Sequence, residues 1–294
     1  MTSPIRWTLL SAFLFSASLL PAQCTDDHRT NKNAGILITD FTITGTQTIS
    51  ATDLARITSR MIGSCYDEDS EEMEERVRAS FQDRGYFRVE VKNLRVKPRD
   101  PLGIPKPVTL EGEVSEGLQY KLGQVTFVKN HAFSAEQLRQ KFPLKKGALM
   151  ERDKIAMGLD SLRKLYARRG YLDFVSIPET QFGSNAKVNL NVTLEEGPQY
   201  HMGKLEIIAE KETAARLRAE WKLAEGDVYD TTYIDDYLTA VRDQLPANFS
   251  KANVQTAQNC PDALVHVRLI LDPAQDSSHS EPKSVPCEEH KDSK

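Results

Sequence analysis

Few residues of this 294-residue chain have the types and spacing that catalysis or metal binding requires. Its six histidines are scattered, and no two of them stand at the four-residue spacing of a helical metal site. The sequence also lacks a nucleophile elbow, a phosphate-binding loop and a dinucleotide-binding glycine motif. We therefore expect a protein that is not an enzyme, with no catalytic residue, no cofactor and no metal.

Two other features could suggest chemistry, but each has a simpler interpretation. The acidic run at residues 67–75 lacks the alternating oxygen ligands and central glycine of a calcium loop, and it suits a solvated helix start. Cys65 has no nearby histidine that would make it a reactive thiol. The four cysteines allow three pairings, and free thiols and a structural disulfide both remain open: Cys24, Cys65, Cys260 and Cys287.

The N-terminus has the pattern of a secretory signal peptide. Arg6 precedes a short apolar stretch that is too short for a comfortable membrane span, and Ala22 provides a small residue at the cut. We expect export with cleavage after Ala22, into the periplasm and in association with the outer membrane. Lipidation at Cys24 is the alternative, although Gln23 stands where a lipobox has Gly, Ala or Ser.

The charge and hydropathy of the remaining chain limit the classes of partner that it can bind. Cleavage removes one of the 38 basic residues and none of the 42 acidic ones, so the net charge changes from −4 to −5. This balance gives no basic footprint for nucleic acid. No second apolar stretch of spanning length follows, so we expect no integral membrane span in the mature chain.

An eight-residue motif occurs twice and divides the chain. The segments 115–123 and 195–203 both contain Glu-Gly-x-Gln-Tyr-x-x-Gly, with the motif glycines Gly117 and Gly197 separated by 80 residues. Arg-Gly-Tyr also occurs twice, at residues 84–86 and 169–171. Repetition at a fixed period indicates an array of similar small domains.

The apolar periodicity within each repeat predicts the order βααββ. We expect an α+β fold of three tandem units, each a three-stranded mixed sheet covered on one face by two helices. The expected segments are a signal peptide (1–22), a disordered leader (23–33), unit 1 (34–117), unit 2 (118–197), a degenerate unit 3 (198–273) and a disordered polar tail (274–294).

Together, the βααββ order, Arg-Gly-Tyr and the Glu-Gly-x-Gln-Tyr-x-x-Gly motif resemble polypeptide-transport-associated (POTRA) domains over residues 34–273. Such domains form the periplasmic arm of the outer-membrane β-barrel assembly and translocation family. That family normally continues into a membrane barrel, whereas a polar tail follows here. We therefore expect a stand-alone protein, with the detached arm of an assembly factor as the alternative.

The resemblance implies that the second strand of each unit is an exposed sheet edge to which an extended peptide can add. We expect these edges at residues 87–91, 171–177 and 253–257, with the third the least suited to binding. The expected partners are unfolded or nascent outer-membrane polypeptides, or a barrel-bearing assembly partner. The candidate edge residues in the first two units are Phe87, Val89, Val91, Tyr171, Asp173 and Val175.

Other motif residues are expected to shape the scaffold. The turns after the second helices contain Gly85, Tyr86, Gly170 and Tyr171. The candidate hinge and joint residues are Gly117, Tyr120, Gly123, Gly197, Pro198, Tyr200 and Gly203. A purely structural protein that docks folded envelope partners through its helix faces is the alternative to peptide binding.

Overall fold

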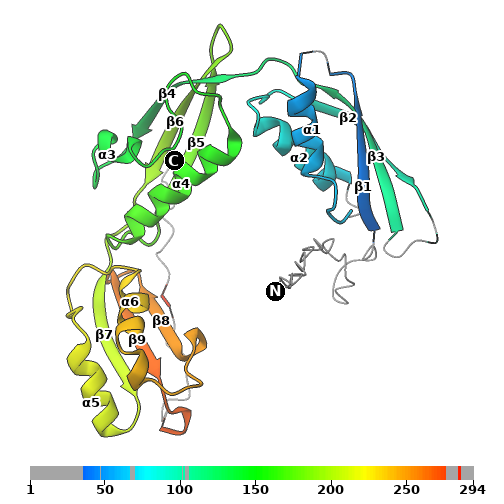
Figure 1. The fold of residues 1–294 in the computed structure, drawn as a ribbon. Helices are drawn as coiled ribbons and strands as arrows, with labels where there is room; N and C mark the ends of the chain where they lie inside the picture. Colours follow the sequence, from blue (N-terminus) through cyan, green and yellow to red (C-terminus); the bar gives the residue numbers. More distant parts are fainter. Residues whose placement is uncertain are drawn as a thin grey trace, which may run out of the picture. The chain divides into compact units, whose positions relative to one another are not determined.

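A computed structural model describes residues 36–46, 48–66, 70–100, 102, 106–275 and 284–285. The expected signal peptide, the leader, Cys24 and Cys287 lie outside the described residues. In the described ranges, the chain repeats one βααββ pattern three times (Figure 1).

The repeats contain the following helices and strands. The first has β1 (Ile36–Thr44), α1 (Ala51–Ser59), α2 (Ser70–Gln82), β2 (Glu90–Pro98) and β3 (Lys106–Ser115). The second has β4 (Lys121–Val128), α3 (Ala135–Arg139), α4 (Arg152–Ala167), β5 (Val175–Phe182) and β6 (Lys187–Glu195). The third has β7 (His201–Ile208), α5 (Lys211–Glu220), α6 (Tyr233–Ala240), β8 (Val254–Asn259) and β9 (Leu264–Ile270).

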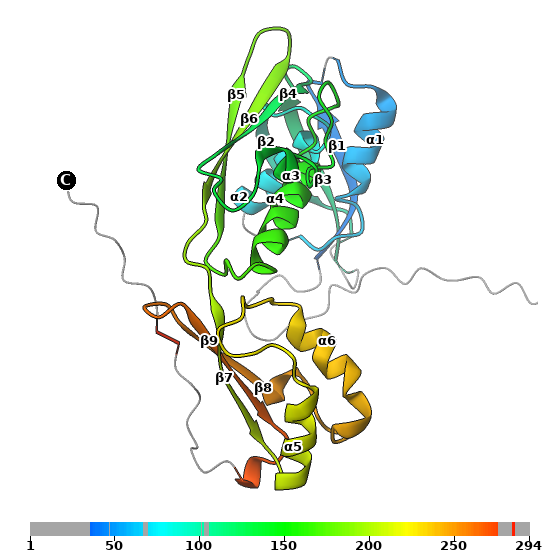
Figure 2. The same ribbon diagram turned by 90° about the vertical axis from the view of Figure 1, so that its left-hand side faces the viewer.

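All three sheets have the same topology. The last strand of each repeat is central, pairing in parallel with the first strand and antiparallel with the second: β1-β3-β2, β4-β6-β5 and β7-β9-β8. The helices cover one face of each sheet (Figure 2). The predicted fold class of three mixed sheets with helices is thus confirmed.

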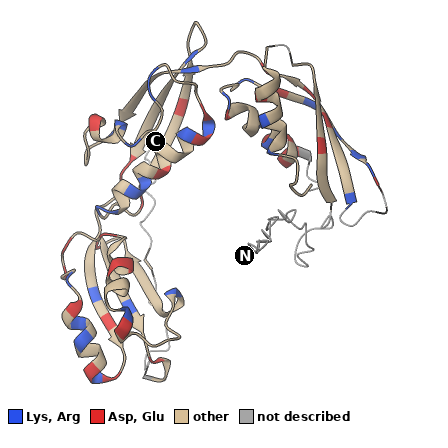
Figure 3. Ribbon diagram, in the orientation of Figure 1, with Lys and Arg blue, Asp and Glu red and all other residues tan. Residues whose placement is uncertain are grey.

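The core of each repeat lies between the helices and the central strand. In the second repeat, the alternating apolar residues of β6 are all buried on the helix face: Val188, Leu190, Val192 and Leu194. The predicted helix starts at Ser50 and Ser134 are also present, since each side chain accepts a hydrogen bond from a backbone N–H in its first turn. Acidic and basic residues are interspersed along the helices (Figure 3).

The chain forms two compact units. One holds the first repeat, including residues 86–117. The other holds the second and third repeats together with the turn Asp83–Gly85. Each unit is described by itself below.

Candidate strand-addition edges and the joint between repeats

The predicted edge strands are the right elements, but two of them begin later than expected. β2, β5 and β8 are terminal strands of their sheets. Only Val91 and Val175 of the six candidate edge residues lie in them. The placement of the other four in strands was wrong: Phe87, Val89, Tyr171 and Asp173.

The reason for this shift is a tight turn after each Arg-Gly-Tyr. Val89 N donates to Tyr86 O at 3.3 Å, and Leu172 N donates to Gly170 O at 3.1 Å. The apolar side chains of Val89 and Phe174 are buried. The alternating apolar residues that predicted an earlier strand start in each repeat therefore reflect packing of the turn.

The edge of β5 has a defined set of outward backbone groups. Gly183 N donates to Lys187 O at 2.8 Å, so odd-numbered residues of this antiparallel hairpin bond to β6. The backbone N–H and C=O groups of Ser176 and Thr180 consequently face away from β6. Pro178 shares this parity, which places its missing N–H on the open side, as is usual for proline in an edge strand.

An apolar row crosses the outer face of the same sheet, the face without helices. Val128 of β4 is opposite Thr193 of β6, which is opposite Ile177 of β5. Val128 and Val175 are each 48% exposed, and Ile177 is 41% exposed. A strand added beside β5 would extend this row, so edge hydrogen bonds and apolar contact are available in one place. The sequence expectations did not include this row. The alternating β-branched residues Val175 and Ile177 are the pattern that indicates it.

The edge of β2 has charged side chains and an irregular pairing, both of which disfavour strand addition. Its pairing with β3 is interrupted by a bulge between Lys92 and Arg95. The exposed Lys92 ammonium lies 2.9 Å from the Glu90 carboxylate. This hydrogen-bonded pair lowers the pKa of Glu90 and raises that of Lys92. Bulges and charged side chains are common devices against strand addition, so β2 is a poorer docking edge than β5.

The edge of β8 contacts a segment of the tail. Val285 forms a parallel bridge with Asn259, in which Val285 N donates to Gln258 O at 2.7 Å and Cys260 N donates to Val285 O at 3.0 Å. The expectation that the whole tail is disordered is therefore wrong for Ser284 and Val285. Their order follows from main-chain pairing, to which a polar composition is no obstacle.

A groove of about 280 Å³ lies beside β8, between the second and third repeats. It has an apolar side from the second repeat and a polar side from β8. Its lining includes Arg163, Tyr171, Phe174, Tyr229, Thr256 and Gln258. Tyr171 thus lines an inter-repeat groove rather than a strand edge.

The two repeated motifs bind each other at the joint between the second and third repeats. Tyr200 N donates to Gly170 O at 2.8 Å, and Gln199 Nε2 donates to Arg169 O at 2.9 Å. The buried Tyr200 hydroxyl also donates to Asp173 Oδ2 at 2.7 Å. Burial, followed by the Asp173 carboxylate, raises the pKa of Tyr200.

The same pair of bonds occurs at the start of the second compact unit. Tyr120 N donates to Gly85 O at 2.8 Å, and Gln119 Nε2 donates to Arg84 O at 2.9 Å. Arg-Gly-Tyr and Gln-Tyr are therefore two halves of one hydrogen-bonded contact. Tyr86, the third residue of the first Arg-Gly-Tyr, is buried in the core of the first repeat.

The glutamate of the motif accepts hydrogen bonds that hold a loop of its own repeat in place. Glu196 Oε1 accepts hydrogen bonds from His131 N at 2.9 Å and from the Tyr166 hydroxyl at 2.8 Å. Burial raises the pKa of Tyr166, and the Glu196 carboxylate adds to this effect. Glu116 accepts a bond from Thr48 N in the first repeat in the same way.

The glycines of the motif have two distinct roles. Gly117 and Gly197 have left-handed φ angles of +66° and +69°, and Pro198 follows the latter, so they turn the chain. Gly123 and Gly203 instead lie within β4 and β7 at bulges. A Cβ on Gly123 would collide with the side chain of Asn189. Bending at Gly117 or Gly197 stays a prediction, whereas Gly123 and Gly203 are fixed within sheets.

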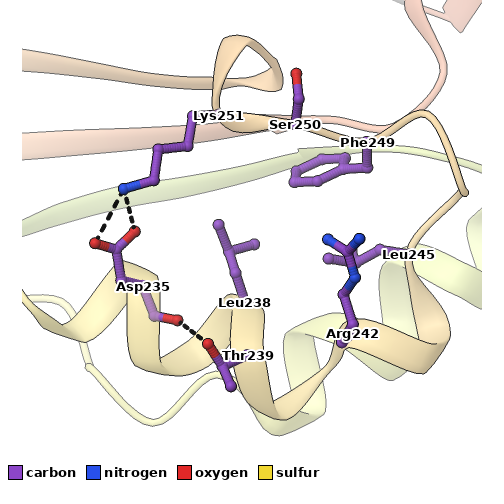
Figure 4. A pocket seen from close by; sticks show the side chains of 8 residues that line it. All are labelled: Asp235, Leu238, Thr239, Arg242, Leu245, Phe249, Ser250 and Lys251. Atoms are coloured by element: carbon purple, nitrogen blue, oxygen red, sulfur yellow. Dashed lines mark hydrogen bonds and ion pairs between the residues drawn. The ribbon is translucent and has the colours of Figure 1, made fainter. Parts of the chain in front are cut away.

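A surface hollow of about 390 Å³ in the third repeat is a weak candidate for a functional site. It lies between α6 and the turn before β8, with Leu238 and Phe249 at its base (Figure 4). Lys251 Nζ pairs with Asp235 Oδ1 at 3.0 Å across its rim. Its other lining residues are Thr239, Arg242, Leu245 and Ser250.

The described residues contain no group of three or more His, Cys, Asp or Glu side chains placed to hold a metal ion. None of the described helices has the length and apolar character needed to cross a membrane.

Comparison with known proteins agrees with this architecture. The POTRA family, described as a surface antigen variable number repeat, matches residues 120–197. A putative outer membrane protein assembly factor of Treponema pallidum is 28% identical over 165 residues, covering 55% of this chain and 20% of that protein. The outer membrane protein assembly factor BamA of Neisseria meningitidis is 21% identical over 198 residues, covering 62% of this chain and 25% of that protein.

The alignments thus span only a fifth to a quarter of these curated relatives. Among solved structures, POTRA domains 3–5 of Haemophilus influenzae BamA superpose with a TM-score of 0.54 at 17% identity, covering 80% of this chain and 96% of that one. The chain is a tandem array of units with the POTRA fold, and its middle unit matches the POTRA family in sequence.

Proposed function

We propose that this protein is an exported, non-enzymatic scaffold of the cell envelope that holds extended polypeptide segments by β-strand addition at the edge of β5. The observation that carries the proposal is the combination found there. Outward backbone groups of Ser176 and Thr180 border the exposed apolar side chains of Val175 and Ile177. Main-chain hydrogen bonds would supply affinity with little sequence requirement, and the apolar row would favour β-branched and aromatic residues.

The partner class follows from this edge. Outer-membrane barrel strands alternate apolar and polar residues, so an unfolded barrel segment offers one apolar side to the row and an unpaired backbone to β5. Export with cleavage after Ala22 would place the protein in the periplasm with such clients. The curated relatives are named as outer membrane assembly factors, which supports the same setting.

The edge can be tested with a single backbone donor. Thr180→Pro removes an N–H that faces away from β6, so the fold of the second repeat should survive. An unfolded, fluorescently labelled barrel precursor should bind this variant roughly tenfold more weakly by anisotropy, since one hydrogen bond and close approach are lost. Thr180→Val keeps the N–H and the shape, and should bind like the unaltered chain. Equal affinity of Thr180→Pro and Thr180→Val would refute edge binding.

The alternative function, docking of folded partners through a helix face, has one supporting observation. Met157 of α4 is 59% exposed, beside an ion-paired patch in which Asp160 bonds Arg163 and Lys164. Under this alternative, Asp160→Lys would abolish partner binding and Thr180→Pro would leave it intact. The opposite pattern supports strand addition.

A further inference from the structure

The groove between the second and third repeats lies at a place where the second repeat itself has an aromatic ring. Phe182 of β5 and Gln258 of β8 are equivalent, because each is opposite the central-strand residue that pairs with the second residue after the motif tyrosine. The Phe182 ring packs edge-on against the ring of the motif tyrosine Tyr120, with centroids 4.9 Å apart. The polar side chain of Gln258 instead lines the groove of about 280 Å³.

One wall of this groove is the end of an aromatic cluster. Phe174 and Tyr171 both line it, and their rings pack on Tyr166 with centroid distances of 4.0 Å and 5.7 Å. A further ring would continue the cluster, and such contacts add to the free energy gained by burying area. The groove has room for one, since a cavity of about 150 Å³ can hold benzene. Thr256 and Gln258 on the opposite wall suit the hydroxyl of a tyrosine.

The joint between the repeats holds the two walls of the groove together. Tyr200 N donates to Gly170 O in the second repeat at 2.8 Å, and Tyr200 O accepts from Tyr229 N in the third at 3.0 Å. Tyr229 is 5% exposed and lines the groove. Because one residue bonds both repeats, the groove is formed before a ligand arrives, which lowers the cost of binding.

The groove is also continuous with the edge of β5. Phe174 immediately precedes β5, and its stacking on Tyr166 of α4 places its side chain on the helix face of the second sheet. Residues opposite each other on neighbouring strands have their side chains on the same face. In a strand added antiparallel to β5, the residue opposite Phe174 would therefore point to the groove. The residues opposite Val175 and Ile177 would lie on the outer and apolar face.

We propose that this groove is a pocket for one aromatic side chain of the bound client, and that it determines which segments β5 prefers. Along an antiparallel client, the preferred order is apolar, any residue, apolar, aromatic. The two apolar residues extend the outer row and the aromatic residue enters the groove. The placement of the client rests on the proposed function, whereas the capacity of the groove to hold a ring does not.

Two labelled peptides test the pocket on the unaltered full chain. Both carry fluorescein and have the sequence Lys-Thr-Thr-Thr-Val-Thr-Val-x-Lys, with tyrosine at x in one and leucine in the other. The tyrosine peptide should bind about fivefold more tightly by anisotropy, because leucine is also large and apolar but makes no ring contacts. Equal affinities, or tighter binding of the leucine peptide, would overturn the pocket.

A variant that fills the groove provides the second measurement. Gln258→Phe adds a ring from within, as Phe182 does at the equivalent place, so both peptides should bind this variant with the same affinity. Gln124→Phe is the matched control, because it adds the same ring at an exposed position of β4 outside the groove. The control should keep the preference for tyrosine. Loss of the preference in both variants, or in neither, would overturn the pocket.

Thr180→Pro separates the pocket from strand addition. It should weaken both peptides by a similar factor and leave the preference for tyrosine unchanged. If the two peptides bind the unaltered chain equally and Thr180→Pro still weakens both, the pocket is overturned and the proposed function stands. If tyrosine is preferred but Thr180→Pro and Thr180→Val bind alike, strand addition and the placement of the client are refuted, and the groove stands as a site for an aromatic ring.

Discussion

The second and third repeats have the same sheet order, but their edge strands are protected differently. β5 has Pro178 at an outward position and exposed Val175 and Ile177 beside it. β8 contains no proline, and its outward groups at Gln258 and Cys260 bond Ser284 and Val285. An unprotected edge invites aggregation. One proline leaves most of the β5 edge usable, whereas a paired tail uses up the end of β8, so identical topology can carry unequal binding capacity.

The connection between the two repeats should be the most sensitive to mutation. Gly170 has a φ of +80°, and a Cβ there would lie 2.5 Å from Tyr200 O. Gly170→Ala should destabilise the second unit by about 3–5 kcal/mol, combining left-handed strain with loss of the joint bonds. Chemical unfolding measures this.

Gly226→Ala in the third repeat is the matched control. Its φ is +89° and no atom lies within 4 Å of the added Cβ. It should cost only the backbone strain, about 1–2 kcal/mol. Equal losses in the two variants would contradict the interlocked joint.

The Tyr200 hydroxyl should contribute a smaller, pH-dependent amount. Tyr200→Phe removes a hydrogen bond to the Asp173 carboxylate and should cost about 1.5–3 kcal/mol at neutral pH. Because burial raises the pKa of Tyr200 in the folded state, its contribution is complete below pH 10 and declines as the pH rises above that value.

Alkaline unfolding curves therefore provide a second measurement. Tyr229 and Tyr237 in the third repeat have pKa values raised to about 12 by burial, so stability should also fall between pH 10 and 12 in the variant. The fall should be shallower in Tyr200→Phe than in the unaltered chain. Identical slopes would show that Tyr200 ionises equally in both states.

The apolar row should make the smallest contribution. Ile177→Ser removes part of the exposed contact beside β5 and should weaken binding of a barrel precursor by about two- to fivefold. Ile62→Ser changes a residue of similar exposure, 43% against 41%, in the first repeat. That control should bind normally. An equal loss in both variants would indicate nonspecific apolar attraction rather than binding at β5.

The sequence predicted the repeat, the order of elements and the identity of the edge strands, because periodicity and the glycine turns are local signals. It misplaced the starts of β2 and β5, since burial of Val89 and Phe174 in a turn imitates strand alternation. The glutamate contacts and the joint bonds join residues about 30 to 70 positions apart, and no local pattern encodes such pairing.

The occupied edge of β8 was not predicted for a related reason. Ser284 and Val285 lie in a polar, charged tail, and their contact with β8 uses main-chain groups that any sequence carries. The third edge was expected from the sequence to be the least suited to binding, but the outer sheet faces on which this difference depends are visible only in the structure.

Photocrosslinking tests the contrast between the two edges most directly. Thr180 of β5 and Gln258 of β8 are matched positions, because the backbone of each faces outward and each is opposite a buried residue of the central strand. With a benzophenone side chain at one position or the other of the full chain, an unfolded barrel precursor should crosslink at position 180 and not at position 258, where Ser284 and Val285 occupy the edge. Equal crosslinking at both, or crosslinking at position 258 alone, would contradict the account.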